Sequence, residues 1–325
     1  MKALFLIQGF EVPSSRYRVL QFLPAWEEAG HEKIVLEHSE ALTDTKKTLE
    51  LAKTCQVVFI HRKRISVSLV KKFKALGCRI VYDVDDAVMF KDATHRTAAS
   101  ASRRWRYKRL MRVVDTIIVG NRYIASHTEG ESHVLPTCLS LKRYEAAREL
   151  PEAEKPTLVW IGDTGSMHYL ERLKPALEEV GKQVAGCRLK IICNTFFDLE
   201  NMEVLKVDWN AETEVQELAD SQVGLMPLAM DSWSRGKCAL KFIQYLAVGR
   251  PAVVTPAGMN ADILELGECG LKAVIDDQWV NAMVTLLNDK DLRHKLGEKG
   301  RQIVADHYSL ESRQAEWVNL VSGQC

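Results

Sequence analysis

The stretch QVVFIHRKRISVSLVKKFKALGCRIVYD (56–83) shows the alternation that decides the fold. Two short apolar runs rich in Val and Ile, at 56–60 and 79–83, flank a segment from Ser66 to Leu76 with amphipathic helical spacing. Such alternation is typical of parallel strands that are joined and covered by helices. The stretch therefore predicts a strand, a helix and a second, parallel strand.

The same alternation extends outward along the chain. It is interrupted once, at the connector LPEAEKP (150–156), which has no apolar periodicity and is typical of a linker. We therefore predict an α/β protein of two Rossmann-like domains that face a central cleft, with ligands beyond the carboxyl ends of the strands. The other predicted strands are ALFLI (3–7), KIVLE (33–37), TIIVG (116–120), HVLP (133–136), TLVWIG (157–162), RLKIIC (188–193), EVLKV (203–207), QVGLMP (222–227), PAVVTP (251–256) and LKAVI (271–275), and further helices are predicted at 17–29 and 102–114.

Charge divides the 325-residue chain in the same place. Residues 1–150 hold 26 Lys/Arg against 17 Asp/Glu, and residues 151–325 hold 18 against 26, so the net charge of +1 conceals a basic and an acidic half. This asymmetry suggests that the two halves have different partners. With 46% hydrophobic and 27% charged residues, the composition excludes a disordered or collagen-like chain.

The cysteines and apolar runs indicate the compartment. Eight cysteines are scattered singly without a Cys-x-x-Cys pair, which predicts reduced thiols and no zinc site. The opening apolar run is too short for a signal peptide, and no run reaches the roughly 18 residues of a membrane span. We expect a cytoplasmic protein that is soluble or bound to a membrane surface.

The segment SWSRGKCALKFIQYLAVGRPAVVTPAG (232–258) is the richest in groups suited to a ligand. We expect a helix that opens at Gly236 and carries Lys237, Lys241 and Gln244 on one face. Helix-start amides flanked by these lysines and Arg235 would suit a diphosphate. The alternative is a solvated basic face on a surface helix.

This segment resembles the donor-binding stretch of GT-B glycosyltransferases of family 4, which often read (R)GKC-x-x-K-x-x-(E/Q)-Y-(M/L)-A-x-G-x-P. The resemblance implies an N-terminal acceptor-side domain (1–150), a nucleotide-sugar donor domain (151–307) and a closing helix (308–325) that returns to the first domain. It extends over PSSRYRVLQFLP (13–24), RIVYDVDDA (79–87), VDTIIVGNRYIA (114–125), VLPTCLSLKRY (134–144), LVWIGDTGSMHYL (158–170), VGLMPL (223–228) and HYSLE (307–311).

One departure from the family pattern concerns the donor. Many relatives carry two glutamates separated by seven residues, the first on the donor sugar and the second on the nucleotide ribose. The aligned positions are Gly236 and Gln244. Gln can hydrogen-bond a ribose hydroxyl, but Gly cannot replace a carboxylate. Sugar recognition must then come from elsewhere, or the donor differs from the commonest ones.

Two glycine turns are further candidates for the donor side. Gly162 and Asp163 follow the first strand of the second domain, where backbone could approach a ligand. The amides of Gly258 and Met259 could hold phosphates or sugar hydroxyls at the start of a helix that Asn260 could cap. Ordinary glycine-containing turns are the alternative at both places.

Acceptor-side candidates lie in the first domain. Gly9 ends the first strand, and Ser15 and Arg16 lead into a helix whose start would favour an anion. Helix capping is the alternative for Ser15. His61 follows another strand and could line the same cleft, although a lone His is more often structural. The resemblance adds Asn121 to this side.

Three carboxylates lie in YDVDDA (82–87), at the end of a strand. They suggest a divalent metal or hydrogen bonds to the hydroxyls of an acceptor. The metal-dependent Asp-x-Asp motif belongs to the other major glycosyltransferase fold, which has a single continuous sheet domain. We therefore expect no metal, and we assign Asp83 and Asp86 to acceptor positioning or to structural hydrogen bonding.

The segment SRRWRYKRLMRVVD (102–115) predicts a basic amphipathic helix. Arg104, Lys108 and Arg112 would form a stripe at i, i+4 and i+8. The stripe is either a solvated surface or a site for anionic lipid head groups or a phosphorylated acceptor. A nucleic-acid partner is not expected, because no nucleic-acid motif is present.

Together with the resemblance, which implies a retaining reaction, these features predict a glycosyltransferase that moves a sugar from a nucleotide diphosphate sugar to a cell-envelope glycan or lipid-linked acceptor. We expect it in the cytoplasm or bound at the inner face of the membrane. No cofactor is expected beyond that co-substrate. Arg235, Lys237 and Lys241 would stabilise the leaving diphosphate, with Arg16 near the acceptor or the phosphates. The alternatives are a non-catalytic homologue that binds a sugar nucleotide or acts as a scaffold, and an epimerase or phosphorylase on the same fold.

Overall fold

The computed structural model describes residues 1–92, 94–95, 97–147 and 150–324, which divide into two compact units. The division does not fall at a single linker. Residues 139–150 group with the second unit, and an eight-residue segment from the second half groups with the first. Unit 1 comprises Met1–Cys138, Asp231–Cys238 and Leu310–Cys325, and unit 2 comprises Leu139–Met230 and Ala239–Ser309.

Unit 1 is built on a parallel sheet with the strand order β2-β1-β3-β4-β5-β6. Successive side chains of β1 enter two different cores, with Leu4 and Leu6 in one and Phe5 and Ile7 in the other. An unbroken apolar run is therefore needed, because both faces are covered. The strands are β1 (Lys2–Ile7), β2 (Glu32–Glu37), β3 (Val57–His61), β4 (Arg79–Val84), β5 (Thr116–Val119) and β6 (His133–Val134).

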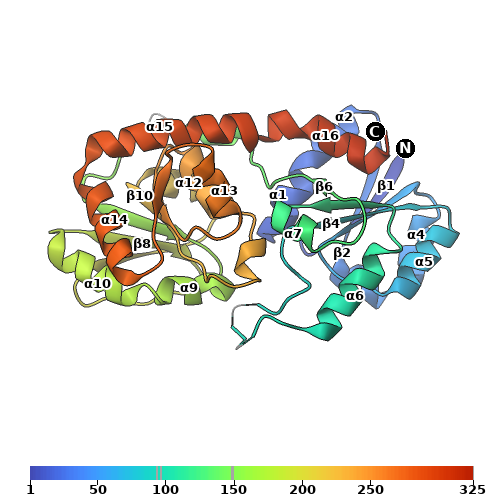
Figure 1. The fold of residues 1–325 in the computed structure, drawn as a ribbon. Helices are drawn as coiled ribbons and strands as arrows, with labels where there is room; N and C mark the ends of the chain where they lie inside the picture. Colours follow the sequence, from blue (N-terminus) through green and yellow to red (C-terminus); the bar gives the residue numbers. More distant parts are fainter. Residues whose placement is uncertain (93, 96, 148–149, 325) are drawn as a thin grey trace. The chain divides into compact units, whose positions relative to one another are not determined.

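Helices cover both faces of this sheet (Figure 1). The closing helix α16 lies beside α2, and its Trp317 is fully buried between Phe22 and Phe5, with ring centroids 5.0 and 5.8 Å away. The helices of unit 1 are α1 (Pro13–Arg18), η1 (Leu20–Phe22), α2 (Leu23–Glu28), α3 (His38–Thr43), α4 (Thr45–Ala52), α5 (Val67–Ala75), α6 (Ala101–Met111), α7 (Arg122–Ser126), η3 (Ser234–Gly236) and α16 (Leu310–Ser322).

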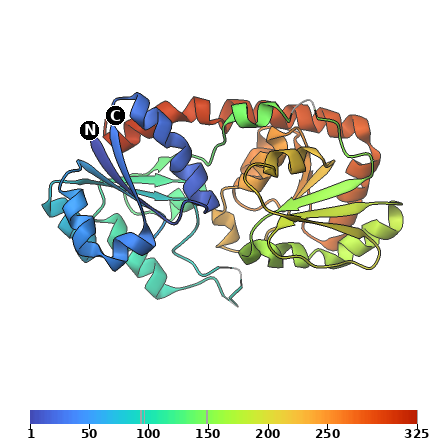
Figure 2. The same cartoon turned by 180° about the vertical axis from the view of Figure 1, so that it is seen from behind.

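Unit 2 has a second parallel sheet, which Figure 2 shows from behind. Its strand order is β12-β11-β10-β7-β8-β9. Its strands are β7 (Thr157–Ile161), β8 (Arg188–Cys193), β9 (Glu203–Asp208), β10 (Val223–Met226), β11 (Ala252–Val254) and β12 (Gly270–Lys272). Its helices are α8 (Leu141–Glu145), η2 (Thr164–Ser166), α9 (Met167–Glu171), α10 (Lys174–Gln183), α11 (Glu214–Ala219), α12 (Leu240–Ala247), α13 (Met259–Glu265), α14 (Asp276–Asn288) and α15 (Lys290–His307).

The predicted α/β architecture of two Rossmann-like parallel sheets is confirmed. Each of the twelve predicted apolar runs overlaps a strand, all in parallel sheets, and the two units have Rossmann-like topology. Strand order reverses between β1 and β3 in unit 1 and between β7 and β10 in unit 2. In sheets of this type ligands bind beyond the carboxyl ends of the strands at such a reversal, so these two positions define where a site should be sought.

Three other predictions concern the helix at 17–29, the cysteines and membrane spans. The predicted helix at 17–29 is broken into α1, η1 and α2. Seven cysteines are free and buried, and the eighth, Cys325, lies outside the described residues. No helix in the described part of the chain combines the length and apolarity that crossing a membrane requires.

Candidate functional site

In unit 2, the turn after β7 lies at the reversal of strand order. Asp163 Oδ1 accepts a hydrogen bond from Ser166 N at 2.8 Å, and Ser166 Oγ accepts one from Asp163 N at 3.2 Å. A side chain at Gly162 would overlap the ring of Trp160. The turn is thus held in a fixed shape, with exposed backbone at the place where a ligand is expected.

Lys241 brings a positive charge to this turn. It lies in the first turn of α12, where its Nζ donates to Ser166 Oγ at 3.0 Å and lies 4.6 Å from the centroid of the buried Trp160 ring. The ammonium is therefore held between an aromatic face and a hydroxyl, in a half-buried position. A cation in such a setting is well placed to bind an anionic ligand.

The predicted basic face of one helix is wrong. Helix α12 begins at Leu240 rather than at Gly236, because Gly236 is in the short helix η3 and Ala239 adopts a left-handed φ of 53° between the two. Lys237 therefore precedes α12 and does not share a face with Lys241. The exposed Arg235 belongs to the segment that groups with unit 1.

Gln244, the predicted ribose ligand, is 3% exposed. Its Nε2 donates to the hydroxyl of the buried Tyr144 at 3.1 Å. Nearby, Tyr245 packs on the sheet, with its hydroxyl on the amide of Ile161 and the carbonyl of Leu225. Position 244 therefore belongs to a packed helix face, and its ribose contact remains a prediction.

The turn after β11 also differs from the prediction. Gly258, with a φ of 54°, is the N-cap of α13, so Asn260 lies inside the helix and does not cap it. Asn260 instead donates to the carbonyl of Thr255 at 2.9 Å. Its Oδ1 is buried and has no hydrogen-bond partner among the described residues. The roles of Gly258 and Met259 in binding a donor stay predictions.

In unit 1, the corresponding strand ends carry a buried ion-pair network. Asp83 is fully buried, and it accepts hydrogen bonds from Arg18 Nε at 3.1 Å and from His61 Nδ1 at 3.0 Å. Burial is the largest single influence and would raise the pKa of Asp83, but the Arg18 charge and the hydrogen bonds from His61 and Arg18 together outweigh burial and lower that pKa. Of the two roles predicted for Asp83, structural hydrogen bonding describes what the side chain does.

A second cluster involves Asp86 and holds the segment 231–238 in unit 1. Asp86 pairs with Arg62 and, at 3.2 Å, with Lys237 Nζ. Asn121 Nδ2 donates to the carbonyl of Gly236 at 3.0 Å, while its Oδ1 caps α7. Asp86, Asn121 and Lys237 were predicted for three different roles, and the structure brings them together in this cluster.

Sequence reasoning did not anticipate this docking of 231–238. The contact is tight, since a Cβ at Gly236 would overlap Ala87 and Cys238 Sγ donates to the carbonyl of Asp85 at 3.0 Å. A Gly followed by a small, buried Cys is the signal that could have suggested close packing. The signal was weak, because the same residues also fit a phosphate-binding turn.

The loop after β1 is closed by Ser15. Its buried Oγ accepts hydrogen bonds from the amides of Gln8 and Gly9, at 3.2 and 3.4 Å. Ser15 therefore fixes the loop rather than capping the helix that follows, since α1 has no side-chain cap. His61 lies beside the same loop, with Nε2 3.2 Å from Ser14 Oγ, and Arg16 is half-buried against the ring of Tyr17.

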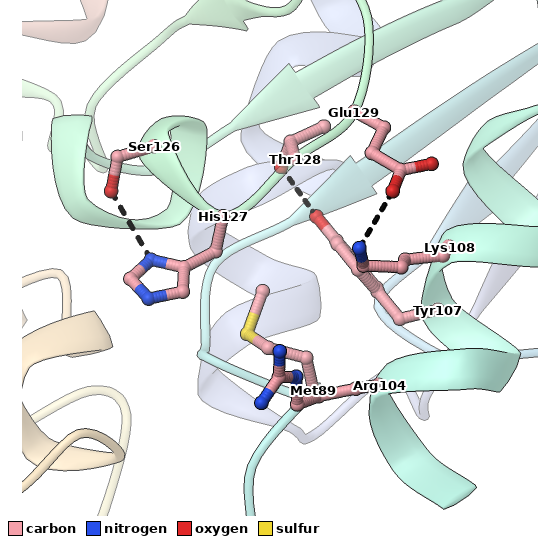
Figure 3. A pocket seen from close by; sticks show the side chains of 8 residues that line it. All are labelled: Met89, Arg104, Tyr107, Lys108, Ser126, His127, Thr128 and Glu129. Atoms are coloured by element: carbon pink, nitrogen blue, oxygen red, sulfur yellow. Dashed lines mark hydrogen bonds and ion pairs between the residues drawn. The ribbon is translucent and has the colours of Figure 1, made fainter. Parts of the chain in front are cut away.

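The predicted basic stripe is not uniform. Lys108 and Arg112 both pair with Glu129, at 2.7 and 3.0 Å, whereas Arg104 lines a separate edge of the recess that Figure 3 shows. Glu129 thus largely neutralises one end of the stripe. The described residues also contain no group of three or more His, Cys, Asp or Glu side chains placed to hold a metal ion.

The sequence matches no protein-family model and no curated protein. Solved structures are similar in fold over almost the whole chain. Sucrose-phosphate synthase from Thermosynechococcus elongatus is 14% identical, with a TM-score of 0.78 and coverage of 99% of this chain and 98% of the other.

Two further solved structures are similar in fold to this chain. HepE from Anabaena, solved with UDP and glucose, is 13% identical, with a TM-score of 0.77 and coverage of 99% and 100%. A glycosyltransferase from Rickettsia africae is 11% identical, with a TM-score of 0.74 and coverage of 100% and 99%. The chain therefore has the fold of GT-B glycosyltransferases.

Proposed function

We propose that this chain is a glycosyltransferase of the GT-B class that uses a nucleotide diphosphate sugar. The observation that carries the proposal is the site of Lys241, where a half-buried cation adjoins the Gly162–Ser166 turn at the reversal of strand order. Neighbours of the same fold are glycosyltransferases, and HepE was solved with UDP. A diphosphate matches both the charge of Lys241 and the exposed backbone of the turn.

The chemical role of Lys241 follows from the reaction. Negative charge grows on the diphosphate as the glycosidic bond breaks, so a fixed cation stabilises the transition state more than the ground state. We further propose a retaining, metal-independent transfer to an envelope glycan or lipid-linked acceptor at the inner face of the membrane. We also propose that Arg235 and Lys237 contribute to stabilising the diphosphate.

The variant Lys241→Ala tests the donor site. Removal of a charge-assisted hydrogen bond costs about 1.5–3 kcal/mol, so UDP should bind roughly 10- to 150-fold more weakly. Transfer should fall at least as far. Lys182→Ala is the matched control, because Lys182 is an exposed lysine of unit 2 that pairs with Glu179. Equal UDP affinity and turnover in Lys241→Ala and the wild type would overturn the assignment.

A nucleotide panel defines the activity further. A ligand of the folded state raises the thermal transition in proportion to the logarithm of its concentration over Kd, so UDP, GDP, ADP, dTDP and CMP can be ranked directly. Incubation with the matching nucleotide sugar should then release free nucleotide. A non-catalytic homologue would bind without release, and an epimerase would change the sugar but keep the diphosphate.

A further inference from the structure

Helix α6 of unit 1 exposes a tryptophan. Trp105 is 56% exposed, whereas Tyr107, Leu110 and Met111 on the other side of the helix are buried. At about 100° per residue, Trp105 lies roughly 160° around the helix from Tyr107, so the ring points away from the core. The guanidinium of Arg109 lies 4.5 Å from the centroid of this exposed ring.

Cations without carboxylate partners surround this tryptophan. We call this set, together with Trp105, the α6 basic surface. Among the residues that the structure describes, no Asp or Glu lies within ion-pair distance of its charged members. The charged members of the α6 basic surface are all exposed and come from α5 and α6. They are Lys71, Lys72, Arg104, Arg106 and Arg109.

Three other lysines of unit 1, which are not part of this surface, pair with carboxylates. Lys47 pairs with Glu40 at 2.8 Å, Lys53 with Glu50 at 2.7 Å and Lys74 with Asp115 at 2.6 Å. Within the described part of the chain, the α6 basic surface thus gathers five exposed cations without a carboxylate partner on two helices, while Lys74 near the end of α5 and Lys108 on α6 are paired. Such a gathering of like charges raises the positive potential at this surface.

This positive potential affects the pKa of a nearby arginine, Arg64. The pKa of Arg64 is lowered, first by burial and then by the positive charges of Arg103 and Arg106. Like charges that repel one another cost free energy in the isolated protein, and an anionic partner would relieve that cost.

The surface is also recessed on both sides of α6. On one side Lys71, Lys72 and Arg109 line a groove between α5 and α6. On the other side Arg104, Ser126 and His127 line the recess of Figure 3, with the Lys108–Glu129 pair at its far edge. Cationic groups and hydrogen-bond donors thus lie where anionic head groups could enter on either side of Trp105.

We propose that the α6 basic surface docks onto an anionic phospholipid membrane, with Trp105 at the level of the head groups. Tryptophan favours the membrane interface because its ring is apolar and its N–H is polar. Single-stranded nucleic acid is usually held by several aromatic rings on which successive bases stack, and α6 exposes one large aromatic. The inference deepens the proposed function, because a membrane surface is where a lipid-linked acceptor would be met.

The test is sedimentation of the full chain with phospholipid vesicles. Vesicles of phosphatidylcholine with roughly one third phosphatidylglycerol should bind the protein, and pure phosphatidylcholine should not. Each cation near an anionic membrane contributes about fivefold in affinity, so Arg106→Ala/Arg109→Ala should bind roughly 20-fold or more weakly. Raising the salt from about 0.1 to about 1 M should release the wild type, since the Debye length falls from about 10 to about 3 Å.

Two further variants sharpen the result. Lys47→Ala/Lys53→Ala removes the same charge from α4 and its C-terminal end, outside the α6 basic surface, and it should bind vesicles like the wild type. Trp105→Ala should weaken binding and abolish quenching of tryptophan fluorescence by brominated lipid, since Trp105 is the most exposed tryptophan described. Equal loss in the control variant would overturn the proposal, because it would indicate a response to net charge alone.

Two outcomes distinguish membrane docking from nucleic-acid binding and from the proposed function. Binding to DNA or RNA oligonucleotides, lost in Arg106→Ala/Arg109→Ala, together with no binding to anionic vesicles would overturn the membrane assignment. The thermal shift with UDP, measured on the same preparations, reports the donor site independently. A protein that binds UDP but not vesicles refutes this inference alone, and one that binds vesicles but no nucleotide refutes the proposed function alone.

Discussion

The carboxyl ends of the strands carry different groups in the two sheets. In unit 1 the strand ends are occupied by charges that neutralise one another, with Arg18, His61 and Asp83 fully enclosed. In unit 2 the same position has a backbone turn, a hydroxyl and the half-buried ammonium of Lys241. Similar topology therefore does not imply similar sites, because the side chains at the strand ends decide what remains accessible to a ligand.

The same difference indicates which strand-end residues stabilise the fold and which can contact a ligand. A buried ion pair contributes little net stability, but loss of one partner leaves the other charge in a site without water. Unit 1 thus depends on its strand-end residues to remain folded. In unit 2 the groups at the turn are exposed or half-buried, so they can change partner without disrupting a core.

Asp83→Asn should produce the largest effect on stability. The change leaves Arg18 buried without a carboxylate, and such a loss typically costs about 3–5 kcal/mol. Hydrogen exchange in urea should show the loss in β3 and β4, with UDP binding by the remaining folded fraction unchanged. Glu50→Gln, in an exposed pair with Lys53, should change the free energy of unfolding by less than about 1 kcal/mol. Similar losses in both variants would contradict the distinction between the two kinds of pair.

His38 should make unit 1 sensitive to mild acid. Burial lowers the pKa of His38 to about 4, and its Nε2–H donates to the carbonyl of His61 at 2.7 Å. The unfolded chain, with a pKa near 6.5, then binds more protons between pH 6.5 and 4. This contribution to stability is complete above about pH 6.5, and about 3 kcal/mol of it is lost as the pH falls to 4.

The measurement is urea unfolding at pH 7 and pH 5. His38→Gln can keep a side-chain N–H but cannot titrate, so the difference between the two pH values should shrink in that variant. An unchanged pH dependence would show that other groups cause the acid sensitivity. The comparison also predicts that hydrogen-exchange protection in unit 2 changes less than that in unit 1.

Ala239→Gly should have the smallest effect. The only non-glycine residues with positive φ in the described chain are Arg62, at the end of β3, and Ala239, just before α12. Each thus lies beside a strand-end cluster, as strained residues at functional sites often do. Glycine at 239 would relieve the left-handed strain, so the free energy of unfolding should rise by roughly 0.5–1 kcal/mol.

Ala261→Gly provides the matched control for strain. Ala261 lies inside α13, where glycine should instead cost about 1 kcal/mol. If both variants were destabilised by similar amounts in chemical denaturation, the φ of Ala239 would store no strain. A stabilised Ala239→Gly with weaker UDP binding would indicate that the conformation of this residue positions Lys241.

The strands and the candidate turns could be predicted from sequence because their signals are local. Apolar runs bounded by Gly, Pro and polar residues define strands in any parallel sheet, and strand ends are the edge where ligands bind. The start of α12 could not be predicted, because Gly236 and Ala239 compete as boundaries. Their choice depends on the packing of Gly236 against Ala87, which is 149 positions away in sequence.

The same reason explains why the partners of several charged side chains could not be predicted. Asp86, Lys237 and Arg62 are distant in sequence, and nothing local shows that they form one cluster. Likewise the stripe on α6 looks uniform until Glu129 is placed beside Lys108 and Arg112. Ion pairing is decided by distances of a few ångströms, and sequence spacing reports such distances only within a helix or strand.

By itself, the sequence determined that this chain forms two parallel sheets covered by helices, and that its cations gather in the first half and around residues 235–241. Tertiary structure alone decided which of these cations are neutralised. It enclosed Arg18 with Asp83, joined Lys237 to Asp86, placed Lys241 Nζ on the hydroxyl of Ser166, and put Trp105 on an exposed basic surface. The physical reason is that burial follows from the local pattern of apolar residues, whereas the partner of a charge is set by which distant segments the fold brings together.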